Sequence, residues 1–202
     1  MTYAATQTLT RWNGGVCPFG AGWRKVMMWW FIVTDGLLFA GFLAAYGYAR
    51  LLAIHWPNQA SVFSLRYIAA MTFVLITSSA TMASAVQAAR EGRPNVALRF
   101  IILTTMGGAV FLGMQAFEWR HLIAEGARLN ANPWGEAAFG AYFFLLTGFH
   151  GTHVLTGVVV LTTTAIRSAM GWSNAEGVEM AGLYWHFVDL VWVFIFTLFY
   201  LL

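Results

Sequence analysis

Long apolar runs separated by short polar stretches form the main pattern of this chain. A bilayer core about 30 Å thick needs roughly 20 apolar residues in a helix. Five segments reach that length, at residues 26–49, 68–89, 98–117, 138–166 and 180–202. The pattern therefore predicts an all-α polytopic membrane protein with five transmembrane helices.

The stretches between these runs are short and polar, and they contain helix breakers. Residues 91–95 (EGRPN) form a predicted tight turn, because Gly and Pro interrupt the helix there. No link is long enough for a soluble domain, and the first 24 residues show no secretory signal pattern. We therefore expect an amino-terminal cytoplasmic or interfacial segment, residues 1–24, and one transmembrane domain, residues 25–202.

The distribution of Lys and Arg predicts the orientation of the helices. One side carries seven of these residues and the other carries four, Arg50, Arg66, Arg120 and Arg128. Cytoplasmic loops are enriched in Lys and Arg. The amino terminus is therefore expected in the cytoplasm, and the carboxyl terminus on the periplasmic or outer side.

Composition supports a membrane protein and excludes several other classes. Hydrophobic residues make up 59% of the chain and charged residues 9%, whereas soluble domains carry about 25% charged residues. The net charge of +3 is spread over short loops, so nucleic-acid binding is not expected. A single cysteine, Cys17, excludes an internal disulfide framework.

Several ionisable residues fall inside the apolar runs, where charge is costly and is typical of functional sites. Asp35 lies ten residues after Lys25, about 15 Å into the membrane. Pairs of residues three apart share a helix face. Two such pairs are His150 with His153 and His186 with Asp189, and Glu179 begins the last run.

Three hypotheses account for these residues before any resemblance is considered. The first is metal or haem binding. Glu118 and His121 have the spacing of carboxylate-bridged metal sites, which need two such motifs, and only one is present. A haem with two histidine ligands would need His150 or His153 to face His186. The other two hypotheses are a proton or ion path through Asp35, His186 and Asp189, and purely structural pairs such as His186 with Asp189.

Four motifs resemble subunit III of haem-copper oxidases, the cytochrome c oxidase subunit 3 family. They are residues 143–154 (FFLLTGFHGTHV), 184–192 (YWHFVDLVW), 33–42 (VTDGLLFAGF) and 112–119 (LGMQAFEW). The resemblance extends over roughly residues 24–202. Asp35 occupies the position of the family's buried glutamate, with a side chain one methylene shorter.

The resemblance implies a five-helix bacterial form of this subunit in the cytoplasmic (inner) membrane. Such a subunit binds no haem or copper and has no catalytic residues of its own. It packs beside the catalytic subunit I, together with subunit II and with or without a small subunit IV. Haem and copper are expected in these partner subunits. It contacts phospholipid and supports proton uptake, for which Asp35 is the candidate acid. The other candidate polar residues would be structural or lipid-contacting: Glu118, His150, His153, Glu179, Trp185, His186 and Asp189.

Other functions remain open at this point. The electron donor could be cytochrome c or a quinol, and related subunits accompany nitric oxide reductases. From different classes, the chain could be a free-standing haem electron carrier using His153 and His186, or an ion transporter using Asp35.

Overall fold

The computed structural model describes residues 22–172 and 174–202, which form helices and their connections. Five helices are long and apolar enough to cross a membrane, as predicted. Most of the expected amino-terminal segment, with Cys17, lies outside the described residues. The elements are α1 (Trp23–Leu52), α2 (Gln59–Val62), α3 (Leu65–Arg90), α4 (Pro94–Ala124), α5 (Ala137–Ala169), α6 (Ala175–Ile195) and the π-helix η1 (Phe196–Leu201).

Helices α1, α3, α4 and α5 are longer than the apolar runs that predicted them. The third run was expected to end at residue 117, but α4 continues to Ala124, so Glu118 lies within the helix. Polar residues can continue a helix into the interfacial region, where a hydropathy pattern no longer marks it. The connection between α1 and α3 contains the short helix α2, whose first turn is capped by the Asn58 side chain accepting from the Ala60 N–H at 3.0 Å.

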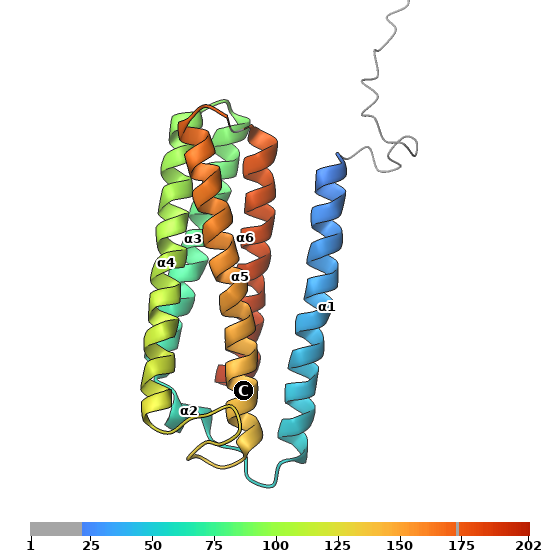
Figure 1. Ribbon diagram of the computed structural model, residues 1–202, viewed down its shortest axis with the longest axis vertical. Helices are drawn as coiled ribbons and strands as arrows, with labels where there is room; N and C mark the ends of the chain where they lie inside the picture. The colour runs from blue at the N-terminus through green and yellow to red at the C-terminus, as the bar shows by residue number, and fades with distance from the viewer. Residues whose placement is uncertain (1–21, 173) are drawn as a thin grey trace, which may run out of the picture.

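Helices α3, α4, α5 and α6 lie side by side as an antiparallel bundle, and α1 stands to one side of it (Figure 1). Small residues allow the closest approaches. A Cβ built on Gly107 of α4 would lie 2.7 Å from the Ser78 Cβ of α3, so these two helices are nearly in backbone contact. The bundle therefore uses small residues as membrane helices generally do.

Trp185 of α6 lies at the centre of the bundle and is 1% exposed. Its indole ring fits between two glycines. A Cβ on Gly108 of α4 would lie 2.4 Å from this ring, and one on Gly157 of α5 would lie 2.8 Å from it. The indole N–H donates to Ser78 Oγ of α3 at 3.1 Å. One side chain thus connects all four helices of the bundle.

The same kind of hydrogen bond occurs at two further places between helices. Trp192 donates to Thr72 Oγ1 at 3.0 Å, and Trp119 donates to Thr147 Oγ1 at 3.1 Å. Each accepting hydroxyl, like that of Ser78, donates in turn to a carbonyl of its own helix. The hydroxyl-rich face of α3 therefore supplies hydrogen-bond acceptors as well as a close-packing surface.

Candidate functional site

Asp35 of α1 and His153 of α5 meet at membrane depth. The Asp35 Oδ2 atom lies 3.2 Å from His153 Nε2, and both side chains are largely buried. Phe39 and Phe149 pack against the His153 ring, with centroid distances of 5.4 and 4.8 Å. The two residues come from helices about 120 positions apart in the chain, so the contact ties α1 to the bundle.

The second nitrogen of His153 is bonded within its own helix. His153 Nδ1 lies 2.9 Å from the Phe149 carbonyl oxygen, which can only accept, so Nδ1 carries a hydrogen. The Nε2 atom is then the one that faces Asp35, whose Oδ2 atom makes no hydrogen bond among the described residues. The pair therefore places an acid and a base 3.2 Å apart inside the membrane, without a hydrogen bond between them.

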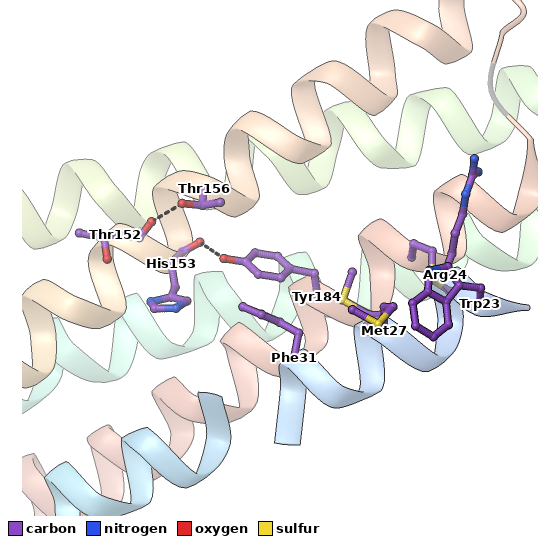
Figure 2. A pocket seen from close by; sticks show the side chains of 10 residues that line it. Trp23, Arg24, Met27, Phe31, Thr152, His153, Thr156 and Tyr184 are labelled. Atoms are coloured by element: carbon purple, nitrogen blue, oxygen red, sulfur yellow. Dashed lines mark hydrogen bonds between the residues drawn. The ribbon is translucent and has the colours of Figure 1, made fainter. Parts of the chain in front are cut away.

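An open groove of about 690 Å³ runs beside this pair, between α1, α5 and α6. Its walls are mainly apolar, with Met27 and Phe31 from α1 and Arg24 at the end near the start of that helix. Figure 2 shows Tyr184 reaching from α6 towards α5, where its hydroxyl donates to the His153 carbonyl oxygen at 3.1 Å. The groove thus joins a cationic side chain at one end to the Asp35–His153 pair at the other.

His186 and Asp189 lie on the side of α6 that faces α3. His186 Nδ1 is 2.6 Å from Ser79 Oγ, and the Asp189 carboxylate also interacts with the Ser79 side chain. Ser79 therefore stands between the two residues, which the sequence suggested as a direct pair. The Asp189 Oδ1 atom has no hydrogen-bond partner among the described residues.

Glu179 connects three helices at the end where α1 and α6 begin. Its carboxylate is in ion-pair contact with Lys25 of α1, and its other oxygen lies 3.1 Å from Arg90 Nη2 of α3. We call this end of the molecule the basic end, defined by Lys25, Arg90 and Arg93. The contacts hold α6 between α1 and α3.

Glu118 is buried near the opposite end of the bundle. Its Oε2 atom accepts from the Tyr200 hydroxyl at 3.3 Å. Tyr200 lies in η1, where the wider π-helical turn replaces the α-helical one at the end of α6. Glu118 and His121 do not form a shared site, since His121 is exposed and pairs with Glu125.

His150 lies fully buried between two aromatic rings. The Phe111 and Trp192 rings have centroids 5.8 and 5.2 Å from the imidazole. Neither ring nitrogen has a hydrogen-bond partner among the described residues. His150 is thus a packing residue in the bundle core.

The three intramembrane histidines are directed at different neighbours. His153 turns towards Asp35 of α1, whereas His186 turns towards Ser79 of α3. His150 packs between α4 and α6, so the facing pair that a haem with two histidine ligands would need is not formed. In the part of the chain that the structure describes, no group of three or more His, Cys, Asp or Glu side chains could hold a metal ion.

Some contributors to these sites were not identified from the sequence. These contributors are Ser79, Tyr200 and the cations that bind Glu179. Each contacts a residue on a helix that is distant in the sequence. Ser79 belonged to a hydroxyl-rich helix, but nothing in the sequence distinguished it from Ser78 or Ser84. Gln115 belongs to the motif at residues 112–119, but the sequence did not indicate its contact. It bridges α4 and α5 by donating to the Thr147 carbonyl oxygen at 2.5 Å.

Comparison with known proteins gives consistent results over nearly the whole chain. The family model described as cytochrome c oxidase subunit III matches residues 18–202. Subunit 3 of the cytochrome bo(3) ubiquinol oxidase of Pseudomonas aeruginosa is 33% identical over 193 residues, covering 94% of this chain and 87% of the relative. Subunit 3 of the cytochrome c oxidase of Alkalihalophilus pseudofirmus is 33% identical, covering 86% and 84%. A probable quinol oxidase subunit 3 of Staphylococcus saprophyticus is also 33% identical, covering 89% of each chain.

Proposed function

This chain belongs to the cytochrome c oxidase subunit III family and is a subunit III of a haem-copper oxidase, and we propose that its Asp35–His153 pair supports proton uptake by that complex. It is a multi-pass membrane protein that forms a complex with other oxidase subunits. We further propose that it packs beside the catalytic subunit I, with subunit II and with or without a small subunit IV. Haem and copper would then reside in the partner subunits.

The observation that carries the proton proposal is the 3.2 Å contact between Asp35 Oδ2 and His153 Nε2. Moving a bare charge into a bilayer costs a few kcal/mol or more. An acid beside a base can pass a proton between the two groups while the total charge of the pair stays the same, which avoids part of that cost. Both side chains are largely buried, as a proton relay inside the membrane requires.

Lipid binding is proposed for the groove between α1, α5 and α6. Its volume of about 690 Å³ and its apolar walls suit acyl chains, and Arg24 is placed to bind a phosphate. We place the basic end at the cytoplasmic face of a bacterial inner membrane, because Lys and Arg gather there.

The electron donor of the complex is proposed to be cytochrome c, with quinol as the alternative. Relatives of both kinds are 33% identical to this chain, so similarity does not favour one of them. Turnover of the purified complex with reduced cytochrome c, compared with turnover on a quinol, decides between them.

The proton proposal is tested by replacing Asp35 in the intact oxidase. Asp35→Asn removes the exchangeable proton but keeps a similar shape, whereas Asp35→Glu keeps the acid. We expect the Asn variant to take up protons more slowly, or to inactivate after fewer turnovers, with its haem content unchanged. The Glu variant should behave more like the parent protein. Proton uptake is followed by a pH-indicator dye in stopped flow.

Thr34→Val provides a matched control. Thr34 is the polar neighbour of Asp35 on α1 and donates only within its own helix, to the Trp30 and Phe31 carbonyls. Unchanged uptake and unchanged inactivation in the Asn variant would contradict the proton role. Purification of the parent chain from native membranes without any haem-copper subunit would contradict the assembly itself.

A further inference from the structure

Helix α1 is attached to the bundle by few buried side chains. The structure describes the whole of this helix, and Phe39 and Tyr46 are its two buried residues. Two grooves lie beside it, one of about 690 Å³ towards α5 and α6 and one of about 440 Å³ towards α6. The position of α1 within the membrane therefore depends on a small number of contacts.

Asp35 does not hold α1 in place by itself. Its Oδ2 atom lies 3.2 Å from His153 Nε2 but makes no hydrogen bond among the described residues. The contact is also sensitive to the rotation of α1. A side-chain atom lies roughly 5–6 Å from the helix axis, so a rotation of about 30° moves it by about 3 Å. Such a rotation would separate the acid from the base, and the contact therefore needs another residue that fixes α1 at this level.

Phe39 is the buried residue of α1 that lies nearest to Asp35 in the sequence. It follows Asp35 by four positions, hence on the same face of the helix, and it is 3% exposed. Its ring packs against two rings of α5, with centroid distances of 5.1 Å to Phe149 and 5.4 Å to His153. Those two rings are 4.8 Å apart, so the three form one cluster. Phe39 thus joins the face of α1 that carries Asp35 to the histidine itself.

His153 is held from the side of the bundle. Its Nδ1–H donates to the Phe149 carbonyl oxygen at 2.9 Å, within α5. The Tyr184 hydroxyl of α6 donates to the His153 carbonyl oxygen at 3.1 Å. These bonds fix the histidine whatever α1 does, so the geometry of the pair depends on where α1 places Asp35.

We infer that Phe39 is a positioning residue for the Asp35–His153 pair. Packed against Phe149 and His153, it fixes the rotation of α1 that brings Asp35 Oδ2 to His153 Nε2. Without the ring, α1 is free to turn about its axis, and the acid and the base separate although both are still present. The inference rests on the proposed proton role of the pair and names a residue on which that role depends.

Proton uptake by the intact oxidase, followed by a pH-indicator dye in stopped flow, tests this role. Phe39→Leu removes part of the bulk of the ring, and Phe39→Ala removes nearly all of it. We expect uptake to slow from the parent to the Leu variant to the Ala variant, which should approach Asp35→Asn with its haem content unchanged. Phe42→Ala is the matched control and should match the parent rate. Phe42 also packs against Phe149, at a centroid distance of 5.5 Å, but lies seven positions from Asp35.

Combining the substitutions separates positioning from general packing. A residue that acts through Asp35 has no further effect once the acid is removed, whereas an independent packing defect adds to that loss. We expect Phe39→Leu and Phe39→Ala to leave uptake unchanged in the Asp35→Asn background. An additional loss in that background, or the same loss in Phe42→Ala, would overturn the inference.

Two further outcomes have a defined meaning. If Phe39→Ala loses its haem-copper partners, Phe39→Leu decides alone, and parent-like uptake in that variant refutes the positioning role. Parent-like uptake in Asp35→Asn refutes the proton role of the pair, and the inference with it. Parent-like uptake in the Phe39 variants alone refutes only the inference and leaves the proposed function intact.

Discussion

Replacing Gly157 with Ala gives a direct test of how the bundle is packed. Gly157 of α5 lies against the Trp185 ring, and a Cβ there would be 2.8 Å from two ring carbons. Ordinary carbon contacts are about 3.5–4.0 Å. The ring cannot simply move away, because Gly108 lies against it and Ser78 accepts from its N–H.

The expected cost follows from these contacts. Inserting a methyl group into a well-packed core costs about 1–3 kcal/mol. Alanine also favours the helix over glycine by roughly 0.5–1 kcal/mol, which offsets part of the clash. We therefore expect Gly157→Ala to lower the free energy of unfolding by about 1–1.5 kcal/mol, taking the middle of the overpacking range less the helix gain.

The free energy of unfolding is measured by titrating the purified protein in mild detergent with sodium dodecyl sulfate and following tryptophan fluorescence. Gly113→Ala on α4 is the matched control, since a Cβ there meets nothing within 4 Å. The control should be neutral or slightly more stable. If Gly157→Ala is as stable as Gly113→Ala, the glycine slot for Trp185 does not constrain the bundle and the reasoning fails.

Two further predictions concern contacts between helices. Ser78→Ala should destabilise the protein by about 0.6–1.7 kcal/mol, because the buried Trp185 N–H loses its acceptor. The control in the same titration is Ser84→Ala, since the Ser84 hydroxyl bonds only to the Ala80 carbonyl oxygen. Equal stabilities of the two variants would contradict the prediction. Glu179→Gln should loosen the start of α1 at a cost of about 1 kcal/mol or less, because its ion pairs are partly exposed. Faster amide hydrogen exchange in the first turns of α1 would show this loosening, with Glu91→Gln as the control, and unchanged exchange would contradict it.

The number and type of helices followed from the sequence because the bilayer imposes a simple rule. Each crossing must satisfy its own backbone hydrogen bonds and expose apolar side chains, so length and hydropathy suffice. The positions predicted for the helix ends were less accurate than the number of helices. Residues such as Glu118 and Ala124 extend α4 beyond its apolar run, and the short α2 has no hydropathy signal of its own.

The candidate residues were identified from charge at depth, but their partners depend on the packing of helices. Asp35 and His153 were both named from the sequence, yet nothing in their spacing placed them together. His186 and Asp189 share a helix face as expected, but Ser79 of α3 stands between them. A single sequence gives the face of each helix, whereas the contact between two faces depends on their rotation and tilt.

The pairing of Asp35 with His153 also has a consequence for how the protein is made. α1 is synthesised first, and the partners that hold it in α5 and α6 follow more than a hundred residues later. During that interval Asp35 is already in the bilayer without its histidine, at a cost of roughly 2.5–3.5 kcal/mol for an aspartate in a helix centre. The docking of α1 is therefore late, because the contacts from α5 and α6 that hold it form only after those two helices have been made.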